Sequence, residues 1–405
     1  MSTVIFAGRV VTCDPSRASA DDALGVFCDA ALVIDRGVVA WLGRASEAPA
    51  CDEAIDARDA VVTPGLVDAH THAAWVGSRH AEYAVRMAGG DYRAIAAAGG
   101  GIASTQRAVA ASSEEEIADA LAARLRRMAQ LGVTCVEVKS GYGLEPEQER
   151  KQLRAIARVA ARRDVPRVIP TFLALHALPA SAPNRAAYVE HVARVLVPEV
   201  ATGGLARFVD AYVDANAFAV DEARTVGLAA RAAGLGVRLH VGQFADVRGA
   251  ELCAELGALS ADHLEHVSAG GIAALASAHV AAGLLPTACF SLAQSPPPVA
   301  ALRAAGVAMV VASDANPGTA PTESLPLAMA IGVRTYGLTI VEAILGATRV
   351  AAASLGEPNR GRIAVGAPAD ISVWDLPHEI AIVQPWGGSR IRRVLRDGVA
   401  IARDT

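Results

Sequence analysis

The sequence contains few cysteines and few aromatic residues, and both shortages narrow the range of possible proteins. Its six cysteines are scattered through 405 residues with no C-x-x-C spacing, which argues against a thiolate metal site and predicts reduced thiols. Aromatic residues make up 4% of the chain and apolar residues 53%, so the predicted core is large and mainly aliphatic. A chain of this length predicts two domains, or one large domain with an appendage.

Strong positive charge and long apolar runs are also absent from the sequence. The formal net charge is −5, which gives no electrostatic basis for binding nucleic acid or an anionic membrane surface. No segment approaches the ~18 uncharged apolar residues of a membrane span. Residues 1–6 lack the basic start and long apolar run of a signal peptide. We therefore expect a cytoplasmic protein whose partner is a small-molecule substrate, with no nucleic acid and no membrane.

The middle of the chain alternates short apolar runs with amphipathic segments rich in alanine, arginine and glutamate. One such segment begins at Ser113, which is followed by three glutamates, a pattern typical of a helix N-terminus. The apolar runs predict eight strands, at residues 61–67, 133–138, 168–173, 208–213, 237–240, 259–263, 280–285 and 307–312. Eight strand–helix repeats predict an α/β fold, a parallel (β/α)8 TIM-like barrel, over its rival, a doubly wound open sheet.

Both ends of the chain differ from the middle, because they contain short strand-like runs separated by turns. Residues 38–42 and 371–374 are examples. We expect the two ends to meet in one small β-sandwich domain. The predicted division assigns residues 1–60 and 363–405 to this domain and residues 61–362 to the barrel.

The most informative segment is D-A-H-T-H at residues 68–72, which directly follows the first predicted barrel strand. Side chains at positions i and i+2 point to the same side of an extended backbone, so His70 and His72 can reach one cation. Imidazole is a suitable ligand for Zn and Fe. Two unrelated surface histidines are the alternative, and further candidate ligands at later strand ends disfavour it.

Five of the ten histidines lie at one predicted rim, the C-terminal ends of the barrel strands: His70, His72, His176, His240 and His263. Asp314 follows the eighth strand. His70, His72, His240 and Asp314 together supply three nitrogens and one oxygen and leave a position for water, as a catalytic zinc site requires. A metal ion lowers the pKa of such a water, and Asp314 would accept its proton. His263 is either a second proton carrier or a local hydrogen-bonding group.

Lys139 follows the second predicted strand and has two interpretations. A lysine at a barrel strand end can be carboxylated and bridge two metal ions, or it can pair with a carboxylate such as Glu137. Bridging lysines in enzymes of this kind usually lie on the fourth strand. The position of Lys139 therefore favours a single metal ion and an unmodified lysine.

Taken together, these motifs resemble the amidohydrolase superfamily and, within it, the imidazolonepropionases of histidine degradation. The pieces that carry the resemblance are G-S-R at 77–79, G-G-G-I-A-S-T at 99–105, E-V-K-S-G-Y-G-L at 137–144, S-A-D-H at 260–263 and D-A-N-P-G-T at 314–319. The resemblance implies hydrolysis of the cyclic amide C–N bond of 4-imidazolone-5-propanoate to N-formimidoyl-L-glutamate. It also implies one Zn or Fe ion per subunit and a homodimer.

The resemblance assigns roles to particular residues of this chain. It places metal ligands at His70, His72, His240 and Asp314, catalytic groups at Asp314, His263 and His176, and substrate contacts at Arg79, Tyr92, Tyr142, His176, Gln243, Asn316, Gly318 and Thr319. The planar fork of Arg79 suits the propionate carboxylate of the substrate. His176 would polarise the carbonyl group that is attacked.

One position departs from the pattern of the family. Some members carry an acidic residue where this chain has Gln243, and an amide cannot act as a general base at neutral pH. Gln243 must therefore bind or orient, and proton transfer is left to Asp314 and His263. The departure keeps one alternative open, a related hydrolase or deaminase that acts on another small carboxylate-bearing N-heterocycle. A ligand-binding barrel that has lost catalysis is a separate alternative; it predicts missing metal ligands, yet all four candidates are present.

Overall fold

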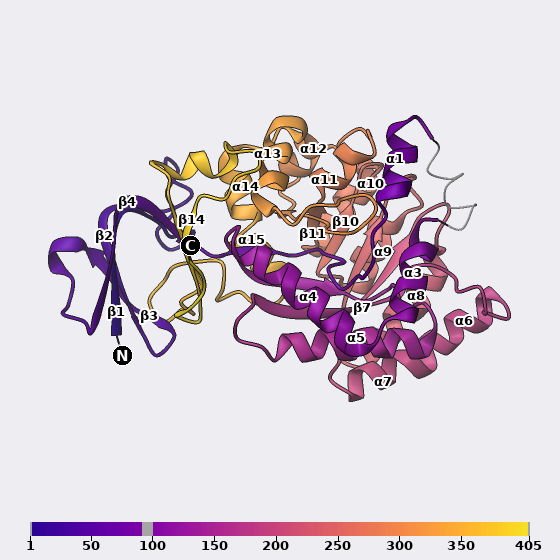
Figure 1. The fold of residues 1–405 in the computed structure, drawn as a ribbon. Helices are drawn as coiled ribbons and strands as arrows, with labels where there is room; N and C mark the ends of the chain where they lie inside the picture. The colour runs from indigo at the N-terminus through magenta and orange to yellow at the C-terminus, as the bar shows by residue number, and fades with distance from the viewer. Residues whose placement is uncertain (1, 91–99, 404–405) are drawn as a thin grey trace.

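The two ends of the chain meet in a seven-stranded mixed sheet, while the middle forms an eight-stranded parallel sheet (Figure 1). The computed structural model describes residues 2–90 and 100–403. In Figure 1 the indigo N-terminal strands and the yellow C-terminal strands lie side by side, next to the barrel. The predicted barrel with an added β unit from both ends is confirmed. The division at residues 60 and 362 stays a prediction.

The β unit takes the form of one hydrogen-bonded sheet. Its strands are β1 (Ser2–Val11), β2 (Val26–Asp35), β3 (Val38–Arg44), β4 (Glu53–Pro64), β13 (Ile371–Trp374), β14 (Ile391–Arg396) and β15 (Val399–Arg403), in the order β15-β14-β13-β4-β1-β2-β3. The short 3₁₀ helices η1 (Ala45–Glu47) and η3 (Glu379–Val383) lie outside the sheet. Side chains of these strands, including Ile5, Leu32, Val62 and Ile371, form an aliphatic cluster of their own.

The barrel strands are β5 (Leu66–Asp68), β6 (Val133–Lys139), β7 (Arg167–Leu175), β8 (Phe208–Val213), β9 (Gly236–Val241), β10 (Ser260–His263), β11 (Ala281–Leu284) and β12 (Met309–Val311), in chain order around the sheet. All eight predicted strands are present. The first was expected at residues 61–67, but residues up to Pro64 extend β4, because they pair with β13 and β1 in the other sheet. Only the last part of that apolar run enters the barrel.

The barrel closes just beyond the C-terminal ends of β5 and β12. A parallel bridge joins Thr71 to Ala315. The backbone N–H of Asp314 donates to the carbonyl of His70 at 3.1 Å, and the N–H of His72 donates to the carbonyl of Ala315 at 3.0 Å. The segments that carry His70, His72 and Asp314, three of the four predicted metal ligands, are therefore held together by the hydrogen bonds that close the barrel.

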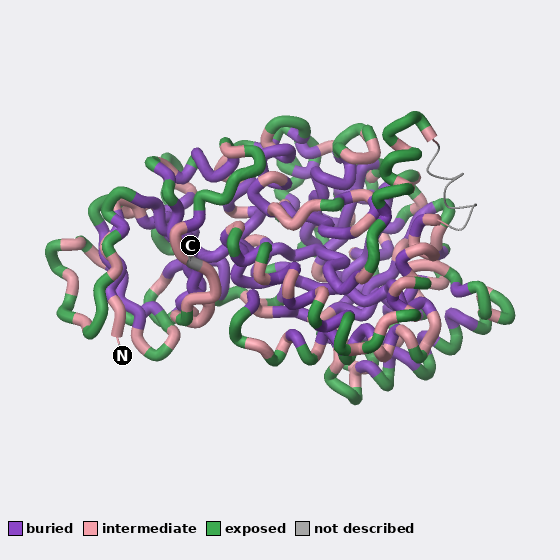
Figure 2. The backbone as a smooth tube through the Cα atoms, in the orientation of Figure 1, coloured by how far each residue is buried: buried purple, intermediate pink, exposed green. Residues whose placement is uncertain are grey.

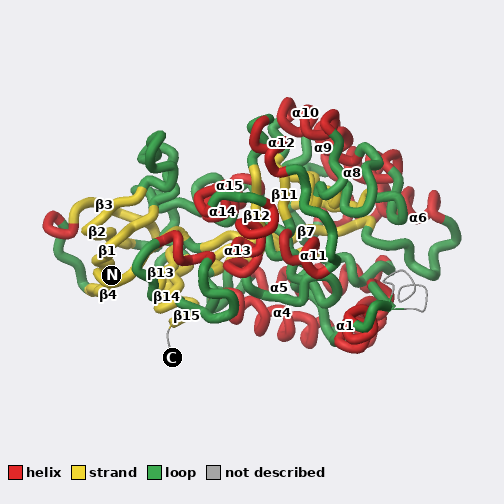
Figure 3. Tube along the Cα trace, turned by 90° about the horizontal axis from the view of Figure 1, so that it is seen from above, coloured by secondary structure: helices red, strands yellow, loops and turns green. Residues whose placement is uncertain are grey.

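Helices cover the outside of the barrel, as Figure 3 shows, and the buried backbone concentrates inside it (Figure 2). They are α1 (His80–Met87), α3 (Ile102–Ala111), α4 (Glu114–Ala129), α5 (Pro146–Ala160), α6 (Arg185–His191), the π-helix η2 (Val192–Leu196), α7 (Val197–Thr202), α8 (Val220–Ala232), α9 (Gly249–Leu256), α10 (Ala269–Ala278), α11 (Pro286–Ser291), α12 (Val299–Ala304), α13 (Leu325–Tyr336), α14 (Ile340–Gly346) and α15 (Arg349–Ser354). Ser113 caps α4 as predicted, in a reciprocal capping box with Glu116. Within the described ranges, no helix combines the length and apolarity needed to cross a membrane.

Candidate metal centre and substrate pocket

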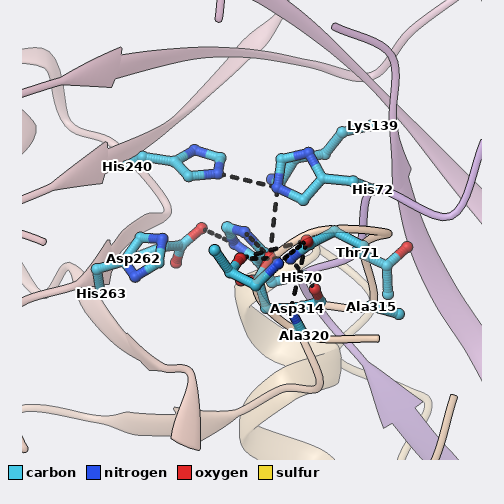
Figure 4. Close-up of polar contacts among 12 residues, drawn as sticks. His70, Thr71, His72, Lys139, His240, Asp262, His263, Asp314, Ala315 and Ala320 are labelled. Carbon is cyan, nitrogen blue, oxygen red and sulfur yellow. Dashed lines mark hydrogen bonds and ion pairs between the residues drawn. The ribbon is translucent and has the colours of Figure 1, made fainter. Parts of the chain in front are cut away.

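Three buried histidines converge at the C-terminal rim of the barrel (Figure 4). His70, His72 and His240 each offer one ring nitrogen within 4.8 Å of the others. The Nε2 atoms of His72 and His240 are 3.2 Å apart. Oδ1 of Asp314 lies 3.5 Å from Nε2 of His70 and 3.4 Å from Nε2 of His72. The four predicted ligands, distant in sequence, thus face a common point.

Carboxylates behind the histidines fix the orientation of two of the rings. Nδ1 of His70 lies 2.7 Å from Oδ2 of Asp262, and Nδ1 of His240 lies 3.0 Å from Oδ2 of Asp210. Such partners at Nδ1 set the tautomer and direct Nε2 toward the centre. Space for the carboxylate of Asp262 is left by Gly283 on the neighbouring strand, where a Cβ atom would lie 2.1 Å from Oδ1.

The centre fits a cation. Nε2 of His70 and Oδ1 of Asp314 are buried and have no hydrogen-bond partner among the described residues. Burial lowers the pKa of His70, but the carboxylates of Asp262 and Asp314 outweigh this effect and raise the pKa to about 9. Burial raises the pKa of Asp314, yet its contacts with His70 and His72 hold that pKa well below its usual value. Positive charge is therefore stabilised here, and a metal ion can replace the proton.

Lys139 is fully buried and pairs with two carboxylates. Its Nζ lies 2.8 Å from Oε1 of Glu137 and 2.8 Å from Oδ2 of Asp210. Burial lowers the pKa of Lys139, but Asp210 and Glu137 raise it above its usual value, so the amine stays protonated. This arrangement supports the unmodified lysine and links it through Asp210 to His240.

A cavity of about 560 Å³ opens beside the metal centre. Its lining residues are His72, Arg79, Gly100, Gly101, Ile102, Ala103, Tyr142, His176, Ala177, Tyr212, Asn216, His240, Gln243, Phe244, His263, Asp314, Asn316 and Thr319. Seven of the eight predicted substrate contacts are among them or, for Gly318, lie next to them. The eighth, Tyr92, lies outside the described residues.

His176 is held in a single neutral form. Its Nδ1 lies 2.7 Å from the carbonyl oxygen of Gly141, so Nδ1 carries the proton. Burial and the neighbouring His72 lower the pKa of His176 to about 3. In this tautomer Nε2 accepts a hydrogen bond and cannot donate one. The geometry therefore supports the substrate-contact role of His176 over the predicted polarisation of a carbonyl group.

Arg79 lies at the start of α1 and is held by an ion pair. Its Nε and Nη2 atoms lie 2.9 Å and 2.8 Å from Oε2 of Glu82. The same oxygen accepts the backbone N–H of Gly101 at 3.0 Å. A Cβ atom on Gly318 would lie 2.3 Å from Nη1 of Arg79, so the guanidinium packs where a side chain would otherwise stand. Gly318 thus gives Arg79 room at the cavity wall.

Asn316 organises its own loop. Its Oδ1 accepts the backbone N–H groups of Gly318 at 2.8 Å and Thr319 at 2.7 Å, and its Nδ2 donates to the carbonyl of Asp314 at 2.7 Å. These bonds support a positioning role in addition to the predicted substrate contact. Gln243 likewise uses Oε1 to accept the hydroxyl of Tyr212 at 2.9 Å, which fits an orienting rather than a basic group.

The loop that carries Tyr142 is held by two side chains of α5 that sequence reasoning did not single out. Glu149 accepts the backbone N–H of Gly141 at 3.0 Å, and Gln152 accepts that of Tyr142 at 3.0 Å. Sequence reasoning also assigned no role to Asp210 and Asp262. The sequence could have indicated both residues, because a charged residue inside a buried strand requires a partner.

Comparisons with known proteins agree with this geometry. Residues 61–401 match the model of the amidohydrolase family. An imidazolonepropionase of Cupriavidus taiwanensis is 42% identical over 391 residues, 95% of this chain and 92% of that protein. Another, of Maricaulis maris, is 44% identical over 374 residues, 91% of this chain and 92% of that protein.

Solved structures support the same fold. A zinc-bound adenosine deaminase from Xanthomonas campestris aligns with a TM-score of 0.72 and 19% identity, over 98% of this chain and 92% of that one. A prolidase complexed with N-methylphosphonate-L-proline aligns with a TM-score of 0.72 and 20% identity over the whole of both chains. The family match and the relatives confirm the resemblance carried by the motifs: the chain belongs to the amidohydrolase family and, within it, to the imidazolonepropionases.

Proposed function

We propose that this protein hydrolyses the cyclic amide C–N bond of 4-imidazolone-5-propanoate and releases N-formimidoyl-L-glutamate. One observation carries the proposal: the same cavity is lined by a cation-stabilising cluster of histidines and Asp314 and, at its wall, by the guanidinium of Arg79. Such a pairing suits a small ring with an anionic tail. The imidazolonepropionases of similar sequence support this choice of substrate.

Each of the following side chains has a separate role in the proposed reaction. A divalent ion held by His70, His72, His240 and Asp314 would acidify a water molecule and polarise the carbonyl group. Asp314 is the buried carboxylate placed to accept the proton that the attacking water loses. Arg79 would bind the propionate tail with charge-assisted hydrogen bonds. His263, which lines the cavity, would pass a proton to the ring nitrogen as the C–N bond breaks.

The direct test is an assay with freshly generated imidazolone propionate, followed through the decay of its absorbance. We expect loss of the ring chromophore and formation of N-formimidoyl-L-glutamate in equal amounts. A chromophore that persists at its uncatalysed rate would contradict the proposed substrate. The second candidate, hydrolysis or deamination of another carboxylate-bearing N-heterocycle, is favoured by Gln243, and a panel of such heterocycles tests it in the same assay.

We further propose one Zn or Fe ion per subunit, because three imidazoles and one carboxylate are a ligand set for a single such ion. Metal analysis of gently purified protein should give about one transition-metal ion per chain. The His240→Ala variant should bind substantially less. A wild-type protein without stoichiometric metal would contradict this proposal. The homodimer and the cytoplasmic location stay predictions, and light scattering would test the former.

The Arg79→Ala variant should raise KM by about 10- to 100-fold and change kcat little, the expected cost of losing a charge-assisted hydrogen bond to the substrate tail. Steady-state kinetics would measure both constants. Arg86→Ala is the matched control, because Arg86 lies on the same helix and donates to Ser291 at 3.0 Å. Equal effects of the two substitutions would argue against recognition of the carboxylate by Arg79.

A further inference from the structure

The turn that ends β10 has an unusual backbone. His263 and Leu264 are consecutive non-glycine residues with positive φ angles of +84° and +71°. Each such residue costs about 1–3 kcal/mol and persists only where the surrounding structure enforces it. Here the backbone N–H of Leu264 donates to the carbonyl of Val241 at 3.0 Å, and that of His266 donates to the carbonyl of Gly242 at 2.8 Å. The strained turn is thereby tied to the end of β9.

The turn places a carboxylate in the interior. The side chain of Glu265 is 1% exposed, and neither of its oxygens has a hydrogen-bond partner among the described residues. Burial of an unpartnered carboxylate is costly, so it calls for an explanation. The ring nitrogen Nδ1 of His263 lies 3.7 Å from Oε2 of Glu265, and it too is buried without a partner in the described part of the chain.

The other polar groups near Glu265 do not replace this partner. The hydroxyl of Tyr336 is buried and interacts with the thiol of Cys289. The thiol of Cys289 is also buried, and burial raises its pKa to about 11. Burial likewise raises the pKa of Tyr336 above its usual value, so both groups stay neutral. Neither group supplies a positive charge to the carboxylate of Glu265, and the ring of His263 lies beside it.

We propose that Glu265 is a positioning residue that accepts a hydrogen bond from Nδ1 of His263 and so holds the tautomer whose Nε2 is free to take a proton. A side-chain movement of about 1 Å brings the 3.7 Å separation into hydrogen-bonding range. This inference rests on the proposed function, in which His263 carries a proton. The oxygen of water bonds to the carbonyl carbon, the C–N bond breaks, and the proton lost by the water reaches the ring nitrogen through Nε2 of His263.

A double-mutant cycle tests the inference. Glu265→Gln should lower kcat by about 10- to 100-fold, as removal of such outer partners does, and change KM little. Asn is the replacement for His263 because it tolerates a positive φ angle. Adding Glu265→Gln to His263→Asn should lower kcat no further, since residues that act as a unit are non-additive. Tyr336→Phe is the control and should change kcat by less than about threefold. An equal loss in both backgrounds would overturn the inference.

A second measurement is independent of activity, because it reads the tautomer of His263 directly. In protein labelled with ¹⁵N-histidine, the ring signals of His263 are those that disappear in His263→Asn. We expect protonated Nδ1 and unprotonated Nε2 in the wild type, and a loss of this preference in Glu265→Gln. Protonated Nε2 in the wild type would overturn the inference. If the tautomer is as expected but imidazolone propionate is not hydrolysed, the proposed substrate fails and the positioning role stands.

Discussion

Asp314→Asn should lower kcat by about 10⁴-fold while the protein remains folded, because the amide cannot accept the proton of the attacking water. The asparagine keeps the volume of the side chain. It also tolerates the backbone of this position, where φ is +52°. The loop that follows it stays anchored, since Asn316 donates to the backbone carbonyl of residue 314, which the substitution leaves in place. Turnover is measured by loss of the chromophore, and folding by circular dichroism.

A matched control separates this effect from the loss of any buried carboxylate at the rim. Asp214 is also buried, and its oxygens accept the backbone N–H groups of Phe244 at 2.9 Å and Ala215 at 2.7 Å. Asp214→Asn should reduce kcat/KM by less than about tenfold, the value of one charged hydrogen bond. If Asp314→Asn retains more than about a hundredth of the wild-type kcat at full metal loading, the assigned role is wrong.

The position of the metal centre follows from the sequence for a simple physical reason. In a parallel barrel every strand ends at the same rim, so His70, His240 and Asp314 meet if each follows a strand. The bridge between Thr71 and Ala315, which closes the barrel, then brings His70 and Asp314 next to each other. Strand order and hydrophobic pattern suffice for this step, and no knowledge of side-chain packing is needed.

The sequence pattern does not predict which carboxylates support the metal-binding histidines. Asp262 lies beside His240 in the strand register, yet its carboxylate contacts His70 across the barrel. That contact depends on the stagger of the strands and on the space left by Gly283. The predicted start of the barrel is too early for a similar reason. An apolar run at residues 61–64 suits both sheets equally, and its pairing with β1 and β13 assigns it to the seven-stranded one.

Lys139→Met should lower the free energy of unfolding by about 3–5 kcal/mol, because it leaves Glu137 and Asp210 buried without their shared cation. Methionine is one atom shorter than lysine but has a similar volume, so the change is mainly one of charge. Unfolding by urea, with a chelator present in all samples, measures the effect apart from metal binding.

The other lysine of the chain provides the control for this charge. Nζ of Lys151 donates to the backbone carbonyls of Val109, Ala110 and Ser112 at 2.9, 3.1 and 2.7 Å, but it is only partly buried and faces no carboxylate in these contacts. Lys151→Met should therefore cost about 1–2 kcal/mol, since water can replace Nζ at the carbonyls. Equal losses for the two variants would mean that the buried carboxylates do not depend on Lys139. A larger loss at Lys139 would identify it as the charge that makes a carboxylate-rich barrel interior stable.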